Sequence, residues 1–399
     1  MTRFVLAWEM GANLGHIDRL GSLARELCAR GHEVRLLLRD LSRTHERLMV
    51  QGLWTGQAPV WLPRLANPPR IGNYAAVLVE AGWLDPAGLA ALLQGWRNTL
   101  DLLQPEVLVC DHAPTALLAT RAWRELPVWA VGTSFTLPPA QPQAPHFPPF
   151  AFWDSAAAAQ CAAWESPLLA SANAALQRLG APPLRSLPEL FQHARLALTS
   201  LPEMSHYQGY AAGTVFSGPT WVGDSGSTPA WPQRAGPRVL VYLSPGDAAF
   251  APLMQALTQL RWPVVLHAKG LAAESSARLS AAGIAVSATP VRMDEALAQA
   301  ELVVGHGGHG TTAAALLAGR PQLLVPSQVE QLMLARRLQT AGLAVMAEPG
   351  DAGRTDWTSL LQRALQPPVP ERVAALARLH LGQNAAASAA RLADLVTSA

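Results

Sequence analysis

Short apolar runs alternate with longer amphipathic stretches along the first half of the chain. Four of these runs predict buried strands, at residues 4–8, 33–38, 107–110 and 128–131. After the first run, leucine and alanine recur at helical spacing, which predicts a helix over residues 17–30 that ends before a glycine. A second helix is expected at 115–123. Such alternation is typical of a parallel α/β sheet.

The same alternation starts again in the second half. Its expected strands are at 239–243, 264–267, 302–305 and 322–325, and its expected helices are at 251–260, 293–300, 311–318, 328–341 and 371–396. Between the halves, residues 218–232 are rich in Gly, Pro and Ser and show no period, which indicates a linker. We therefore expect an α/β protein divided into a domain at 1–218, a linker at 219–236, a domain at 237–375 and a C-terminal helix at 376–399.

Length and charge agree with two globular domains and narrow the class of partner. The 399 residues exceed the roughly 250–300 residues at which one hydrophobic core stops growing. Half of them are apolar and 15% are charged, which excludes a disordered chain. The 30 basic and 28 acidic residues give a net charge of +2, so no basic field indicates nucleic acid or an anionic membrane as partner.

The sequence indicates a cytoplasmic protein in a reducing compartment. Cys28, Cys110 and Cys161 are too scattered for a disulfide framework or a zinc site. Glu9 interrupts the first apolar run, so that run is expected to be a strand and not a signal peptide. We expect no membrane-spanning helix, because no run of about 18 uncharged apolar residues occurs.

The strand expected at 302–305 runs into a glycine-dense turn with the sequence Gly-His-Gly-Gly-His-Gly, and Thr311 or Thr312 opens the next helix. Glycines let the backbone approach a ligand closely, and a helix N-terminus offers unpaired N–H donors and partial positive charge. The combination of strand, turn and helix predicts a phosphate-binding loop.

A dinucleotide enzyme is one reading of this loop, since Gly305, Gly307 and Gly310 spell GxGxxG. However, such fingerprints do not call for an imidazole within the turn, where His306 lies. The next acidic residue, Glu330, lies beyond the following strand's end, where a ribose-binding carboxylate is not expected. An NAD(P)-dependent oxidoreductase is therefore the alternative.

A longer pattern continues from the turn. Its residues are His306, Gly308, Thr311, Gly319, Pro321, Pro326, Glu330 and Gln331, with looser markers at Gly15-His16, 30–34, Asp111 and 217–219. With this pattern the sequence resembles the nucleotide-sugar-dependent glycosyltransferases of family 1. This is the UDP-glycosyltransferase type, and the bacterial branch that decorates antibiotics and other natural products is the most similar.

The resemblance implies the GT-B fold, in which two Rossmann-like parallel-sheet domains face each other across a cleft. In that fold the C-terminal helix is a candidate to pack back on the first domain. A UDP- or dTDP-hexose would be the co-substrate, with its diphosphate held by His306 and by the turn and helix start. The residues expected at the diphosphate are His306, Gly307, Gly308, Gly310, Thr311, Thr312 and, from the other side, Ser244.

The rest of the donor is expected to meet three further positions. By resemblance, Glu330 and Gln331 would hydrogen-bond the sugar hydroxyls, and the backbone near Val291 would meet the nucleobase. We expect no metal, because no third ligand is spaced to join His306 and His309 and no Asp-x-Asp occurs.

The resemblance also implies that His16 is the general base for an acceptor hydroxyl and that Asp111 orients it. Both residues follow expected parallel strands, whose C-terminal ends converge on one crevice. An imidazole with an unperturbed pKa near 6.5 suits proton removal at neutral pH. The expected reaction is inverting transfer of a hexose without a metal.

The acceptor is expected to be a small, apolar or aromatic molecule. Prolines and aromatic side chains crowd the stretch 135–150, which could be a stiff surface loop or the wall of an acceptor pocket. The residues proposed for that wall are Phe135, His146, Phe147 and Phe150. Besides the oxidoreductase, a nucleotide-sugar epimerase on the same fold and a non-catalytic donor-binding relative stay open as alternatives.

Overall fold

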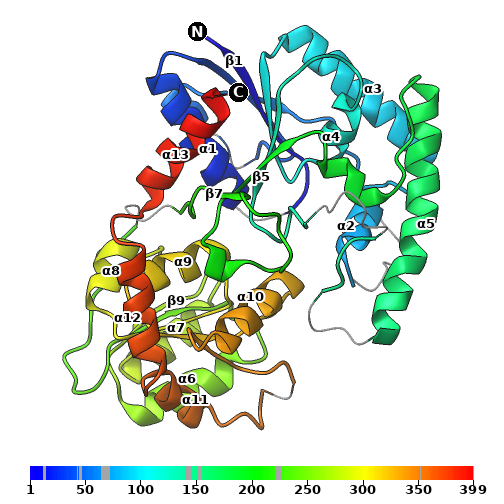
Figure 1. Cartoon of the computed structure of the whole chain (residues 1–399). Coiled ribbons are helices and arrows are strands. Elements are labelled where there is room, and N and C mark those ends of the chain that lie inside the picture. Colours follow the sequence, from blue (N-terminus) through cyan, green and yellow to red (C-terminus); the bar gives the residue numbers. More distant parts are fainter. Residues whose placement is uncertain are drawn as a thin grey trace. The chain divides into compact units, whose positions relative to one another are not determined.

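A computed structural model describes residues 1–11, 15–42, 44, 47–63, 72–139, 146–150, 155–221, 226–350 and 352–398, with the backbone alone for 155–162 (Figure 1). The chain forms two compact units. Unit 1 holds Met1–Leu201, Tyr207–Thr220 and Ala386–Ala399, and unit 2 holds Pro202–His206 and Trp221–Ala385. Within the described residues, no helix combines the length and apolar character needed to span a bilayer.

Unit 1 is built on a parallel sheet in the order β3-β2-β1-β4-β5-β6-β7. The strands are β1 (Arg3–Trp8), β2 (Glu33–Leu38), β3 (Trp54–Gln57), β4 (Val107–Asp111), β5 (Val128–Gly132), β6 (Arg195–Leu198) and β7 (Val215–Phe216). The chain reverses its direction of strand addition between β1 and β4, which is where open α/β sheets form their ligand crevice. In the register of this pair, Trp8 lies opposite Asp111 at the C-terminal edge.

Helices cover both faces of this sheet. They are α1 (Gly15–Ala29), α2 (Tyr74–Glu80), α3 (Pro86–Leu103), α4 (Pro114–Thr120), α5 (Ser155–Arg178) and α13 (Ala385–Thr397). One core cluster joins the sheet to α2, α3, α4 and α5, and a second joins it to α1 and α13. In the second cluster Leu392 and Val396 of α13 pack with Phe4 and Leu20, so the C-terminal helix does pack on the first unit (Figure 1).

Unit 2 repeats the architecture with the order β10-β9-β8-β11-β12-β13. Its strands are β8 (Val239–Tyr242), β9 (Val264–His267), β10 (Ala285–Ser287), β11 (Leu302–Gly305), β12 (Gln322–Leu324) and β13 (Val345–Met346). Its helices are α6 (Phe250–Leu260), α7 (Ala273–Ala281), α8 (Met293–Gln299), α9 (His309–Leu317), α10 (Val329–Thr340), α11 (Trp357–Ala364) and α12 (Val369–Leu379). The reversal point lies between β8 and β11, so the loops after these two strands share one edge.

The predicted helices at the C-terminus and after the glycine turn differ from those in the structure. The long helix expected at 371–396 is split into α12 and α13, and Gly382 in the break has a φ of 84°, a conformation that ends helices. The helix expected to open at Thr311 or Thr312 opens at His309 instead, with Gly308 as its N-cap.

Candidate functional site

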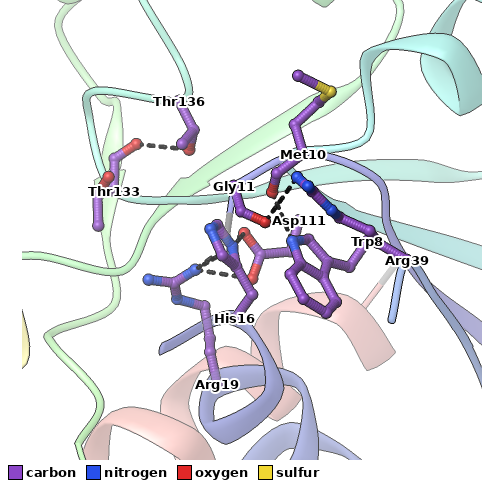
Figure 2. Close-up of polar contacts among 9 residues, drawn as sticks. All are labelled: Trp8, Met10, Gly11, His16, Arg19, Arg39, Asp111, Thr133 and Thr136. Carbon is purple, nitrogen blue, oxygen red and sulfur yellow. Dashed lines mark hydrogen bonds and ion pairs between the residues drawn. The ribbon is translucent and has the colours of Figure 1, made fainter. Parts of the chain in front are cut away.

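The crevice of unit 1 holds a histidine–aspartate pair. His16 is the second residue of α1 and Asp111 is the last residue of β4. Nδ1 of His16 donates to Oδ1 of Asp111 across 3.0 Å (Figure 2). The structure thus brings together two residues that stand far apart in the sequence. Because Nδ1 donates its proton, the lone pair of the ring is on Nε2, the atom that would act as a base.

Gly11 leaves room for this ring. It has a φ of 86°, and a Cβ atom added to it would lie 2.6 Å from Nε2 of His16. Its backbone is fixed by a hydrogen bond from Arg39 to its carbonyl at 2.9 Å. On another side, the indole of Trp8 stacks on the imidazole with ring centroids 5.4 Å apart (Figure 2). The ring of His16 is therefore held in one orientation by packing as well as by its hydrogen bond.

Arg19 is a third member of this cluster and was not predicted from the sequence. It lies one turn after His16 on α1, and its Nη1 donates to both carboxylate oxygens of Asp111, at 2.8 and 2.7 Å. Burial raises the pKa of Asp111, but the cation of Arg19 and the imidazole of His16 together bring it below its ordinary value. Asp111 is therefore an ionised carboxylate at neutral pH. The i, i+3 spacing was the available signal.

His112 was also missed, and it follows the aspartate directly. Its φ is 48°, which is uncommon for a residue with a side chain, and its carbonyl accepts from the amide of Met10 at 3.0 Å. The buried ring lies 5.8 Å from that of His16, and neither of its nitrogens has a hydrogen-bond partner among the described residues. Burial, followed by the nearness of His16, lowers its pKa to about 3. Strained residues such as this one gather at functional sites.

In unit 2, His306 joins the loops that follow β8 and β11. Its Nε2 accepts from the backbone N–H of Ser244 at 2.9 Å, and its Nδ1 lies 3.2 Å from the carbonyl of Val325. Nδ1 is also 3.6 Å from a carboxylate oxygen of Asp247. Both ring nitrogens thus contact protein groups. The structure brings the predicted residues His306 and Ser244 together, and the imidazole holds the loop of Ser244 through this hydrogen bond.

The glycine turn opens directly into α9. Gly307 has a φ of 84°, and no atom lies within 4 Å of where a Cβ on Gly308 would be. No side chain caps this helix, so its first-turn amides, which include those of Gly310 and Thr311, point out of the helix end. The predicted role for Thr312 needs correction: because α9 starts at His309, its amide already donates to the carbonyl of Gly308 at 3.0 Å and its side chain is buried.

Of the residues predicted for sugar and base, Gln331 lies beside this turn. Gln331 accepts at Oε1 from the amide of Ser327 at 3.0 Å, and its carbonyl is 3.5 Å from where a Cβ on Gly307 would be. Glu330 is half-buried in the first turn of α10. The backbone of Val291 is already bonded to the hydroxyl of Tyr242, through its N–H at 2.9 Å and its carbonyl at 3.3 Å.

The residues predicted to form an acceptor wall lie largely in the core. Phe147 and Phe150 are buried, and Phe135 stacks on Phe150 with ring centroids 5.5 Å apart. His146 is half exposed and hydrogen-bonds the buried carboxylate of Glu165 at 3.0 Å. Residues 140–145 of this stretch lie outside the described residues. The described aromatic residues therefore pack the interior of unit 1.

A small hollow, with a cavity volume of about 10 Å³, lies beside the histidine cluster and was not predicted. Its lining is mostly apolar and includes Met10, Val60, Trp61 and Leu62. Met10 is joined to the cluster through its amide bond to the carbonyl of His112. A cavity of this size holds about one water molecule, so it is too small for an organic ligand.

Two comparisons with known proteins bear on identity, and a third finds nothing, since no curated protein matches the chain by sequence. Residues 251–387 match the family model described as "Erythromycin biosynthesis protein CIII-like, C-terminal domain". The predicted family resemblance is confirmed. The matched range spans α9 and α10, which carry the glycine turn and the expected sugar-binding residues.

Among the solved structures similar to the whole chain are several glycosyltransferases. The calicheamicin glycosyltransferase CalG4 has a TM-score of 0.69 at 18% identity, covering 100% of this chain and 98% of that chain. The spinosyn rhamnosyltransferase SpnG, complexed with thymidine diphosphate, has a TM-score of 0.65 at 21% identity, covering 99% of this chain and 100% of that chain. The glycosyltransferase SnogD from Streptomyces nogalater has a TM-score of 0.60 at 20% identity, covering 99% of both chains. The predicted GT-B fold is confirmed.

Proposed function

We propose that this protein is an inverting glycosyltransferase that moves a hexose from a dTDP- or UDP-sugar to a hydroxyl of a small, apolar or aromatic acceptor. The observation that carries the proposal is the pair formed by the part-buried His16 and the fully buried Asp111 at the strand reversal of unit 1. A carboxylate on Nδ1 holds the imidazole in the tautomer with a free Nε2, as in the hydrolase triads. The full-length likeness to glycosyltransferases supports the reaction class.

In this reaction Nε2 of His16 takes the proton of the acceptor hydroxyl while its oxygen attacks the anomeric carbon. The bond from that carbon to the diphosphate oxygen breaks with its electron pair, and the nucleoside diphosphate leaves. A single displacement inverts the configuration at the anomeric carbon. Asp111 stabilises the imidazolium that forms, because its carboxylate is ionised and only 3.0 Å from Nδ1.

The donor diphosphate is assigned to the first turn of α9. The amides of Gly308, Gly310 and Thr311 and the positive end of the helix dipole would stabilise its negative charge. His306 would act there by holding the Ser244 loop in place. This arrangement supplies charge stabilisation from the protein itself, so we propose that the reaction needs no metal. The described residues contain no cluster of three or more His, Cys, Asp and Glu side chains that could hold one.

The sugar and base are assigned to the residues around this turn. Glu330 and Gln331 open α10 beside Gly307 and would hydrogen-bond the hexose hydroxyls. The nucleobase would lie near Val291, whose backbone bonds to Tyr242 would have to open or be shared. Since SpnG was solved with thymidine diphosphate, dTDP is the first nucleotide to test.

The donor half of the proposal is tested by thermal unfolding with UDP, dTDP, GDP and NADP⁺, each with EDTA. A ligand at 100 times its Kd stabilises the state that binds it by about 2.7 kcal/mol, which gives a measurable rise in Tm. We expect a rise with dTDP or UDP. A rise with NADP⁺ alone would support the oxidoreductase and contradict the proposal. The variant Thr258→Val on α6 serves as a control. It should show the same rises in Tm as the wild type, because residue 258 is far along the sequence from the turn.

A further inference from the structure

Arg19 and His16 share one carboxylate. Both project from the start of α1, one helical turn apart, and both donate to Asp111. The side chain of Arg19 is 7% exposed and that of Asp111 is fully buried. Asp18, between them, pairs instead with Arg47. Hydrogen bonds to a charged partner at 2.7–2.8 Å are of the strong kind, so the carboxylate is fixed by the arginine even without the histidine.

This sharing changes the charge of the site. A histidine–aspartate pair alone carries one negative charge, and it becomes neutral when the imidazole takes a proton. With Arg19 included, the cluster is neutral at first and gains a net positive charge on protonation. In addition, Nη1 of Arg19 lies 3.5 Å from Nδ1 of His16. Two like charges at this distance repel each other.

The other charged and titratable groups around His16 do not reverse this balance. His112, whose ring is 5.8 Å away, is neutral because burial lowers its pKa to about 3. Arg39 donates to the loop after β1 and adds a second cation to the region. Glu9, directly after β1, accepts from the amides of Thr115 and Ala116 at 2.8 and 2.7 Å, and burial raises its pKa to about 8, so it is mostly uncharged at neutral pH.

Resting on the proposed function, we propose that Arg19 is a positioning residue for the reaction. By holding both oxygens of Asp111, it fixes the carboxylate against His16 and keeps the imidazole uncharged, and therefore able to accept a proton, at lower pH than a histidine–aspartate pair alone would allow.

The test is the pH profile of kcat/KM for Arg19→Gln and Arg19→Lys. Without the cation, the acidic limb should move to higher pH by about one to three units, the usual effect of one neighbouring charge. At a pH on that limb, Arg19→Gln should thus be at least about tenfold less active than the wild type, with the gap closing at pH 9. Arg19→Lys keeps the charge and should keep the limb. Arg25→Gln, on the same helix with an exposed partner in Gln51, is the control.

A readout without turnover separates this inference from the proposed function. The NMR titration of the His16 ring, assigned with His16→Asn, should show its midpoint moving to higher pH in Arg19→Gln. If Arg19→Gln does not fold, Arg19→Met is used in its place in both measurements. If the midpoint and the acidic limb stay in place while His16→Ala is inactive, the role of Arg19 is refuted and the general base stands. If His16→Ala keeps full activity, the proposed function fails, and the NMR midpoint alone decides whether Arg19 controls the charge of the ring.

Discussion

Asp111→Asn is the substitution whose consequences the structure defines most sharply. It keeps the size of the side chain but replaces one acceptor oxygen with an NH₂ donor. In the wild type, Oδ1 accepts from both His16 and Arg19, and Oδ2 accepts from Arg19. An amide cannot accept at both positions. One orientation sets its NH₂ against the guanidinium alone, and the other sets it against both Nδ1 of His16 and Nη1 of Arg19.

Either orientation has a cost that can be stated. Arg19 stays buried without its counterion, and breaking a buried ion pair from one side costs about 3–5 kcal/mol of unfolding free energy. At about 2–4 °C per kcal/mol for a domain of 150–250 residues, Tm should fall by on the order of 10 °C. Where the NH₂ faces Nδ1, the imidazole proton moves to Nε2, the base loses its lone pair, and kcat falls by about 10²–10⁴.

The stability loss should also depend on pH in a defined direction. The pKa of Asp111 is lowered on folding, so its ionised form stabilises the protein above the unfolded value near 4, and this contribution is lost as the pH falls through the lower folded value. The difference in Tm between the wild type and Asp111→Asn should therefore be full at pH 7 and shrink below about pH 4.

A double-mutant cycle decides whether the buried pair is the cause. Adding Arg19→Met removes the stranded cation, so Asp111→Asn/Arg19→Met should recover most of the lost Tm. Asp101→Asn, which removes an exposed carboxylate that pairs with Arg124 at 3.5 Å, should change Tm by no more than a degree or two. The reasoning is refuted if Asp111→Asn melts with the wild type, or if the double variant is no more stable than Asp111→Asn.

Three further substitutions test other parts of the structure. His112→Asn introduces a residue that tolerates the φ of 48° and removes a ring with a pKa of about 3. As the pH drops from 6.5 toward 3, the free energy of unfolding of the wild type should therefore fall relative to that of the variant. Chemical denaturation should show a difference of up to about 1.4 kcal/mol per pH unit. Gly132→Ala sets a Cβ 2.4 Å from Oγ1 of Thr136 beside the histidine cluster, so Tm and kcat should both fall, while unchanged values would show that the segment yields freely. His306→Ala releases the amide of Ser244 and should weaken dTDP binding about tenfold by calorimetry, and equal affinity would exclude any part in donor binding.

The pairing of His16 with Asp111 could be predicted because it follows from topology. Both residues stand just past apolar runs, and the C-terminal ends of parallel strands meet at one edge of a sheet. By contrast, the contact from Arg19 to Asp111 joins residues 92 positions apart through side-chain conformation alone. The helical spacing placed Arg19 near His16, but no pattern indicated which way the guanidinium would turn.

Local signals competed at the positions where the predicted elements were wrong. Thr311 and Thr312 are good N-cap residues, yet Gly308 takes the cap because the glycine turn ends there, and the helix starts two residues early. The alanine-rich C-terminus keeps a helical period past Gly382, but the left-handed conformation of that glycine splits the helix and lets α13 return to unit 1. Edge strands such as β7, two residues long, are too short to give a pattern.

The acceptor wall shows a different limit of sequence reasoning. Clustered aromatic side chains suit a pocket lining and a packed interior equally well, and composition does not separate the two. In the structure, Phe147 contacts Tyr74 and Phe191 edge-on, which is core packing. Trp61 and Met10, which line the hollow beside the cluster, are separate in the sequence and meet only in the fold.

Product formation by His16→Ala tests the central claim most directly. The control is His32→Gln, whose residue lies directly before β2. We incubate the wild type, His16→Ala and this control in EDTA with dTDP-glucose or UDP-glucose and a panel of phenols and aliphatic alcohols. The glycoside and the nucleoside diphosphate that form are measured together. For the wild type and for the control, we predict that glycoside and nucleoside diphosphate form in equal amounts and that NMR shows an inverted anomeric configuration. For His16→Ala, we predict a kcat about 10²–10⁴ times lower. Glycoside formation by His16→Ala at the wild-type rate would contradict the account.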